Sequence, residues 1–150
     1  DLIGSICTQR HVSVDVLIHV QTVGKLFNPK LWGNCNELRL HRADDTIERH
    51  KGKISGNMEH LLIMESLISL KYRSGDKRFF CYLDKDIGKI RGHFTKHDFI
   101  KAIEDYLGSN YSKILKPLLN KRHIYSGKKL YQNQKEAVID YIRGLMKEYL

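Results

Sequence analysis

The residues whose types and spacing best suit a chemical role are cations that recur in the second half of the chain, after Gly108. Lys113, Lys116 and Asn120 stand at positions i, i+3 and i+7, so a helix places them on one face. Lysines suit phosphate contacts, whereas an amide or a guanidinium can also reach the edge of a base. We therefore predict nucleic-acid contacts from Lys113, Lys116, Asn120, Lys121, Arg122, Lys128 and Lys129.

The charge of the chain supports a polyanionic partner. The 150 residues carry 26 Lys and Arg against 17 Asp and Glu, a net charge of +9 with histidine neutral. Residues 1–75 hold 10 cations and 8 carboxylates, whereas residues 76–150 hold 16 and 9. A concentrated positive field attracts nucleic acid, which binds with release of counterions. Two alternatives stay open: an acidic protein partner, and a charge that serves solubility alone.

Helical periodicity predicts two helices in and before the basic region. Thr95 and Asp98 have capping-box spacing, and apolar residues at helical spacing continue from there to Gly108. A second apolar stripe covers residues 111–119 and predicts the helix that carries the first lysines. Pro117 lies inside this stripe, so we expect a kink or a restart of the helix there.

The end of the chain predicts a β-hairpin and a last helix. A Ser-Gly pair lies between short β-like runs within residues 124–132, which is a hairpin signal. Asn133 and Glu136 have capping-box spacing, and a wide apolar face then continues to about Leu150. We expect this face to close the protein's own core. The alternative is that it forms a homodimer or docks a protein partner.

The first half of the chain predicts β structure followed by a buried helix, because alternating β-branched residues give way to a run that is apolar nearly all round. The predicted elements before the helix are a strand at 12–21, a loop at 24–36 with Trp32 packed on the core, a short strand at 37–41 and a linker or mobile loop at 42–57. The helix begins at Met58 with Asn57 as N-cap. A strand at 78–83, a turn at 84–88 and a strand at 89–92 follow it.

The order helix, strand, helix, turn, helix, hairpin over residues 57–132 resembles a winged-helix domain, a helix-turn-helix variant with a β-hairpin wing. The resemblance is densest in SNYSKILKPLLNKRHIYSGKKLYQ, residues 109–132. The matching residues are Ile114-Leu115, Leu118-Leu119, Lys121-Arg122, Ile124, Gly127 and Tyr131. Pro117 and His123 depart from the usual pattern. The resemblance implies binding to nucleic acid or, as in many winged helices, to protein.

We therefore predict an α+β protein in two parts. Residues 1–56 form a small β-containing N-terminal segment with a loop or linker. Residues 57–150 form a winged-helix-like helical portion with a β-hairpin wing and a C-terminal helix.

Metal-dependent chemistry is weakly indicated, and we predict neither a metal nor another cofactor. The zinc-ligand types Cys7, His11, Cys35 and His41 lack the two tight pairs of a structural zinc site. The candidates for a metal-dependent nuclease are Asp44, Asp45, Glu48 and His50, together with Glu37-x-Arg39 and Asp15. No GxxxxGK[ST] phosphate loop and no GxSxG nucleophile motif occurs.

Composition also bears on location. No apolar run approaches the ~20 residues of a membrane helix, so we expect no membrane partner. Residues 1–23 show no signal-peptide pattern. Three cysteines, Cys7, Cys35 and Cys81, cannot all pair within one chain, which favours a reducing intracellular compartment, cytoplasm or nucleus.

Together these observations predict a non-catalytic nucleic-acid-binding domain, with DNA preferred over RNA. The alternatives are a protein-interaction subunit of a larger assembly, and a metal-dependent nuclease or its DNA-recognition portion. Among the aromatic residues of this half, Tyr111 is expected in the core. Stacking of Tyr125 and Tyr131 on unpaired bases is a further alternative.

Overall fold

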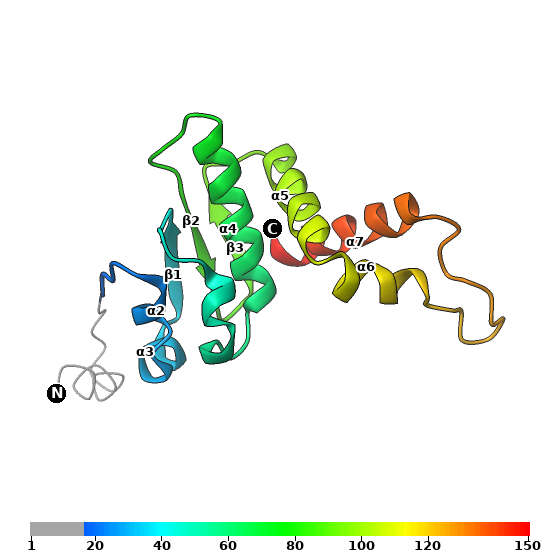
Figure 1. The fold of residues 1–150 in the computed structure, drawn as a ribbon, viewed down its shortest axis with the longest axis horizontal. Helices are drawn as coiled ribbons and strands as arrows, with labels where there is room; N and C mark the ends of the chain where they lie inside the picture. Colours follow the sequence, from blue (N-terminus) through cyan, green and yellow to red (C-terminus); the bar gives the residue numbers. More distant parts are fainter. Residues whose placement is uncertain (1–16) are drawn as a thin grey trace.

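A computed structural model describes residues 17–150, which form a mixed α and β fold, 54% helix and 12% strand, as expected for an α+β protein (Figure 1). The elements are α2 (Val23–Leu26), α3 (Pro29–Asn34), β1 (Glu37–His41), the 3-10 helix η2 (Ile47–Lys53), α4 (Met58–Arg73), β2 (Phe80–Asp84), β3 (Lys89–Gly92), α5 (Lys96–Ser109), α6 (Tyr111–Leu119) and α7 (Gln134–Tyr149). None of these helices is long and apolar enough to span a bilayer.

The three strands form one antiparallel sheet in the order β1-β2-β3. Leu38 pairs with Leu83, and Leu83 pairs with Ile90, so these three side chains lie on the same face. All three are buried, as is Cys81 opposite Leu40. The predictions for residues 37–41, 78–83 and 89–92 are confirmed to within two residues. Burial raises the pKa of the Cys81 thiol to about 12.

Helix α4 is the central element, as its nearly continuous apolar sequence predicts. It packs on the sheet on one side and on α5 on the other (Figure 1). Leu61, Ile63, Met64, Leu67 and Ile68 are all buried in the core. Asn57 is the N-cap residue of α4, as predicted, but it does not cap the helix through its side chain. Asn57 has a left-handed φ of 57° and its side chain accepts no capping hydrogen bond.

The loop predicted at residues 24–36 instead contains α2 and α3. The Asn28 side chain accepts a hydrogen bond from the Lys30 N–H at 3.0 Å, and Pro29 occupies the first helical position, where its missing N–H costs nothing. Trp32 is buried as predicted, and its indole N–H donates to the carbonyl of Ser55 at 3.0 Å. Most of the first predicted strand, residues 12–16, lies outside the described residues, and residues 17–20 have no regular structure.

The linker predicted at residues 42–57 is also replaced by structure, the 3-10 helix η2. The N–H of the buried Ile47 donates to Glu65 Oε1 on α4 at 3.0 Å. Asp45 Oδ2 accepts hydrogen bonds from the Gly24 N–H at 3.1 Å and from His50 Nε2 at 2.7 Å. This segment therefore joins the parts expected at 1–56 and 57–150, which also share the β1–β2 pairing and one hydrophobic core.

Helix α5 begins with the predicted capping box. Thr95 Oγ1 accepts from the Asp98 N–H at 3.1 Å, and Asp98 Oδ2 accepts from the Thr95 N–H at 2.8 Å. The same carboxylate lies 2.7 Å from Lys71 Nζ, which ties the start of α5 to the end of α4. The hydrogen bonds from Lys71 and Thr95 lower the pKa of Asp98 to about 2.

The C-terminal helices close the core from the other end. Helix α6 continues through Pro117 and ends two residues later, so the chain does not restart at the proline. Asn133 caps α7 by accepting from the Glu136 N–H at 3.0 Å, whereas the Glu136 carboxylate bonds the Gln132 N–H. The apolar face of α7 closes the protein's own core, as predicted, with Ala137, Ile142, Leu145 and Tyr149 buried.

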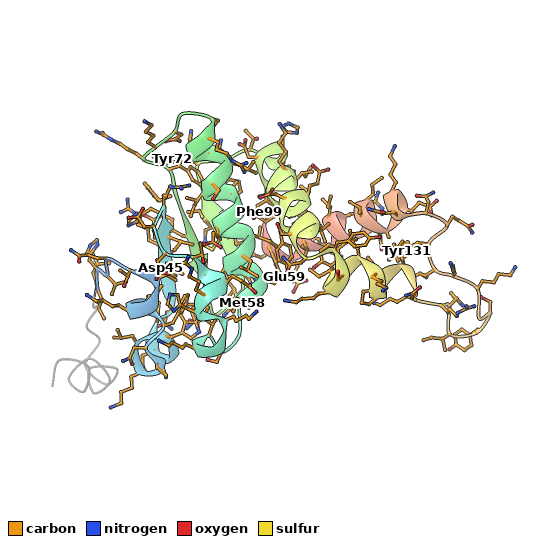
Figure 2. All side chains as sticks on the ribbon, viewed as in Figure 1. Asp45, Met58, Glu59, Tyr72, Phe99 and Tyr131 are labelled. Atoms are coloured by element: carbon orange, nitrogen blue, oxygen red, sulfur yellow. The ribbon has the colours of Figure 1, made fainter. Side chains whose placement is uncertain are left out.

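A carboxylate on α4 binds α7 directly. Both oxygens of Glu59 accept hydrogen bonds from tyrosine hydroxyls of α7, one from Tyr141 and one from Tyr149 at 2.6 Å. The ring of Tyr149 also stacks on His60 with centroids 3.9 Å apart. Burial and the Glu59 charge raise the pKa values of Tyr106, Tyr141 and Tyr149. Glu59 therefore lies where α4, α5 and α7 meet (Figure 2).

Asp98 predicts how stability depends on pH. A carboxyl whose pKa is lowered by folding stabilises the fold above its unfolded pKa, and this contribution is lost as pH falls through the folded pKa. We expect the free energy of unfolding, measured by denaturant titration, to fall between about pH 4 and about pH 2. Asp98→Asn is expected to flatten this part of the profile. An unchanged profile in the variant would contradict the assignment to Asp98.

Removing the Glu59 carboxylate is expected to destabilise the attachment of α7. Glu59→Ala leaves two half-buried hydroxyls without their acceptor, at a cost of about 2–4 kcal/mol in unfolding free energy. Glu59→Gln keeps one acceptor oxygen and should lose less. Hydrogen exchange should show faster exchange of the α7 amides than of the sheet amides in Glu59→Ala. Equal stability of Glu59→Ala and wild type would refute this role.

Candidate nucleic-acid interface

The segment that carries most of the predicted basic residues lies at the end of the molecule farthest from the sheet (Figure 1). Helix α6 follows α5 almost without a break, because Asn110 ends α5 and begins α6. The chain then extends away from the helices before it returns to start α7 (Figure 1). We call residues 121–130 of this extension the basic arm.

Hydrogen bonds between its two sides give the basic arm a defined shape. The Leu130 N–H donates to the Lys121 carbonyl at 2.9 Å, and the His123 N–H donates to the Lys128 carbonyl at 2.8 Å. Between them, Arg122 and Lys129 form a single antiparallel bridge. The hairpin predicted at residues 124–132 therefore starts earlier, at residue 121, and has one bridge in place of two strands.

Glycine allows the basic arm to turn. Gly127 has a φ of 65°, which glycine adopts without the strain that a β-carbon imposes. Its N–H donates to the His123 carbonyl at 2.9 Å, and its own carbonyl accepts from Arg122 Nη1 at 3.0 Å. One of the predicted contact residues thus also braces the turn.

The basic arm and α6 belong to a stretch of sequence that carries positive charge alone. The sequence contains no Asp or Glu between Asp105 and Glu136. The cations in that interval are Lys113, Lys116, Lys121, Arg122, Lys128, Lys129 and Lys135. Every residue from 120 to 130 is exposed, and the ion pairs found among residues 17–150 involve other residues. These cations are therefore accessible to a polyanion.

The structure brings together most of the predicted contact residues. Lys121, Arg122, Lys128 and Lys129 flank the two sides of the basic arm, which the bridge and the hydrogen bonds hold next to each other. Lys116 is exposed on α6, and Asn120 is exposed where that helix ends and the arm begins.

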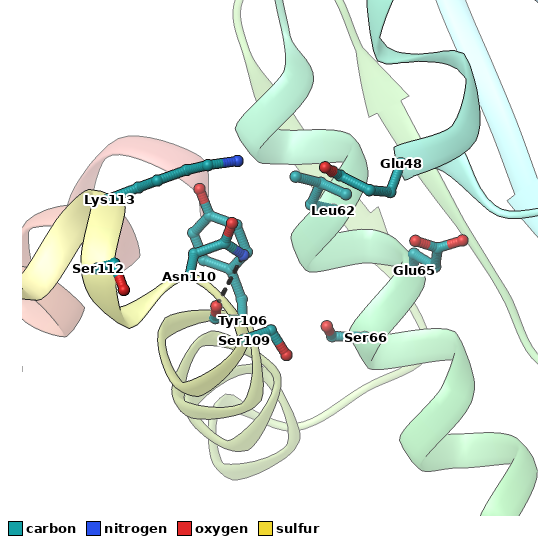
Figure 3. A pocket seen from close by; sticks show the side chains of 9 residues that line it. All are labelled: Glu48, Leu62, Glu65, Ser66, Tyr106, Ser109, Asn110, Ser112 and Lys113. Atoms are coloured by element: carbon teal, nitrogen blue, oxygen red, sulfur yellow. Dashed lines mark hydrogen bonds between the residues drawn. The ribbon is translucent and has the colours of Figure 1, made fainter.

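Lys113 is the exception. It extends from α6 toward Glu48, and its charge contributes to the lowered pKa of that carboxyl, after the larger effect of Lys51 at 2.7 Å (Figure 3). Both groups line a pocket of about 400 Å³ between η2, α4, α5 and α6. The lining residues are Glu48, Leu62, Glu65, Ser66, Tyr106, Ser109, Asn110, Ser112 and Lys113. We therefore separate Lys113 from the basic arm.

The pocket has mixed charge and does not extend the positive surface. Glu65 is half-buried there, and its burial raises the pKa of its carboxyl, although the Ile47 N–H partly offsets this shift. Two carboxylates face one lysine across the pocket (Figure 3). This composition is poorly suited to a phosphate, which needs an excess of donors and positive charge.

The aromatic residues of this region differ from their predicted places. Tyr111 is 42% exposed, although its position on the apolar stripe predicted a core residue. Tyr131 donates its hydroxyl to Asp140 Oδ2 at 2.7 Å, which raises the pKa of the tyrosine. Tyr125 and its neighbour Ile124 are 93% and 92% exposed. Ile124 is a surface residue that sequence reasoning missed, because an isolated isoleucine is ordinarily assigned to the core.

Of the residues considered for metal chemistry, Cys7, His11 and Asp15 lie outside residues 17–150, and Asp45, Glu48 and His50 are engaged in hydrogen bonds with other groups. The Cys35 thiol donates to the Glu37 carbonyl at 3.1 Å, and the Arg39 guanidinium lies 3.8 Å from the centroid of the Phe80 ring. Within the described part of the chain, no group of three or more His, Cys, Asp or Glu side chains is arranged to hold a metal ion.

Comparison with known protein families, with curated proteins and with solved structures finds no match for this chain. No residue role is therefore transferred from a relative. The roles of the basic arm and of the pocket are inferred from their own geometry.

The turn at Gly127 predicts a local effect of substitution. A β-carbon at Gly127 meets no neighbouring atom, so Gly127→Ala should suffer only from its positive φ, about 1–2 kcal/mol. We expect faster hydrogen exchange at the His123 and Leu130 amides and an unchanged global melting temperature. Gly127→Asn is the matched control, since asparagine tolerates this conformation better. Unchanged exchange in Gly127→Ala would show that the turn does not hold the arm together.

Proposed function

We propose that this protein binds nucleic acid without catalysis, and DNA in preference to RNA. The observation that carries the proposal is the fully exposed basic arm, in a stretch of sequence that has no carboxylate. Binding of a polyanion to such a surface releases condensed counterions and is favourable for any sequence. The contacts are mainly to phosphates, through Lys116, Lys121, Arg122, Lys128 and Lys129, with Asn120 and Arg122 able to reach base edges.

We further propose that α5, α6 and the basic arm act as the helix pair and wing of a winged-helix-like unit. Its support is the order of the elements: α6 follows α5 directly, and the arm follows α6 with its turn at Gly127. In this arrangement α6 and the arm approach the same stretch of backbone. The free thiols of Cys35 and Cys81 suit the reducing intracellular location that this role implies.

An acidic protein partner is the second candidate, because the basic arm also exposes the apolar side chains of Ile124 and Tyr125. Charge complementarity alone does not separate it from DNA. The two candidates differ in salt dependence, since counterion release from a nucleic acid gives a steep linear response of log affinity to log salt concentration.

Charge reversal at one lysine of α6 and one lysine of the basic arm tests the proposal. We expect anisotropy titrations of labelled duplex DNA to give a log–log salt slope of about −4.5, or about −0.9 for each of the five cations. The double variant Lys116→Glu/Lys129→Glu should lower the affinity at least tenfold and reduce the slope by about 2.

A control with the same change in net charge separates the basic arm from a general field. Lys25→Glu/Lys101→Glu alters exposed lysines on α2 and α5 and should change the affinity less than threefold. Equal losses in the two double variants would contradict a local interface. Absence of binding to any oligonucleotide at moderate salt would favour the protein partner, and cleavage of DNA with Mg²⁺ would contradict a non-catalytic role.

A further inference from the structure

At the tip of the basic arm, the side chains of Ile124 and Tyr125 are almost fully exposed. We call Ile124, Tyr125 and Ser126 the apex of the arm. Ile124 and Tyr125 are 92% and 93% exposed, more than any other large hydrophobic residue within residues 17–150. Such exposure is unfavourable in water, which suggests that another molecule covers the apex in the working state.

The apex is held in place rather than simply extended. The hydrogen bonds of His123 with Lys128 and with Gly127 close the turn on both sides of it. Arg122 and Lys129, which form the bridge, and Lys128 lie within four positions of Tyr125. An aromatic ring is therefore presented on a closed turn with positive charge on either side.

Tyr125 differs from the other tyrosines near the C-terminus. Tyr131, Tyr141 and Tyr149 each donate the hydroxyl to a carboxylate. The Tyr125 hydroxyl has no hydrogen bond within the described part of the chain, and the nearest ring, His123, is tilted by 53° with its centroid 6.0 Å away. The faces of the Tyr125 ring are thus available for stacking.

We propose that the apex binds unpaired bases, so that the ligand is single-stranded nucleic acid or the unpaired end of a duplex. Tyr125 stacks on a base, Ile124 packs beside it, and the flanking cations hold the neighbouring phosphates. This inference rests on the proposed function and names the form of nucleic acid that is bound. Base stacking tolerates any sequence, as the charge of the basic arm does.

A lipid surface is the other polyanionic partner that an apolar apex could meet. Two apolar side chains followed closely by charged residues offer little area to a bilayer, and interfacial anchors bury a whole apolar helix face. An aromatic ring flanked by cations fits the alternation of base and phosphate along a single strand more closely.

Affinities for two DNA forms test the inference. With a labelled single-stranded oligonucleotide, Tyr125→Ala is expected to bind about tenfold more weakly than wild type, and Tyr125→Phe within twofold. With the blunt duplex of the same length, Tyr125→Ala should differ from wild type less than twofold. Tyr72→Ala is the matched control. It removes a tyrosine at the end of α4, away from the basic arm (Figure 2), and should change neither affinity.

A spectroscopic variant gives a second readout. Tyr125→Trp places an indole at the apex, while Trp32 stays buried in the core. Single-stranded DNA is expected to quench the emission of the apex tryptophan, and vesicles of anionic phospholipid should leave it unchanged. A blue shift with vesicles and no response to DNA would overturn the inference, whereas the proposed function is tested separately by Lys116→Glu/Lys129→Glu.

The two proposals fail in different ways. An unchanged single-strand affinity in Tyr125→Ala, with weaker binding by Lys116→Glu/Lys129→Glu, would refute the stacking role and leave phosphate binding intact. Equal losses of single-strand and duplex affinity in Tyr125→Ala would also refute it. Because Tyr125 lies outside the core, its variants are expected to keep the melting temperature of the wild type, which circular dichroism checks.

Discussion

One carboxylate, that of Glu59 on α4, ties the last helix of the chain to the central one. It accepts hydrogen bonds from two tyrosines of α7, which are 82 and 90 residues away in the chain. A half-buried carboxylate is stable only when donors replace the water it has lost, so α7 and Glu59 require each other. Helix α7 in turn packs against α6, from which the basic arm extends. The hydrogen bonds of Glu59 therefore help to hold the helices from which the arm extends.

Elements with local determinants were predictable from the sequence. The capping box of Thr95 and Asp98, the alternation around Leu83 and the apolar run after Met58 each depend on residues a few positions apart. The segments that differ from prediction depend on distant partners. Helix η2 relies on Glu65, 18 positions from Ile47, and the stretch around α2 relies on Asp45, 21 positions from Gly24. Composition alone suggested loops in both places.

The candidate interface shows the same division. Residue types and helical spacing identified the cations, but the spacing does not tell which side of α6 meets the rest of the protein. Lys113 is therefore separated from the basic arm by a neighbour, Glu48, that no local pattern connects with it. The exposure of Ile124 and Tyr125 was not predictable from the sequence either, because an isoleucine and a tyrosine beside a glycine turn fit a buried hairpin as well as an exposed one.

The buried thiol of Cys81 offers a chemical probe of local unfolding at the sheet. The Cys81 thiol is buried between the strands and α4, and with a pKa of about 12 it carries almost no thiolate at neutral pH. An alkylating reagent reacts with the thiolate, so it modifies this site only during the moments when the strands separate from the helix. The labelling rate at Cys81 therefore reports how often the sheet and α4 separate. A ligand that stabilises the folded state slows this reaction even if it does not contact the sulfur.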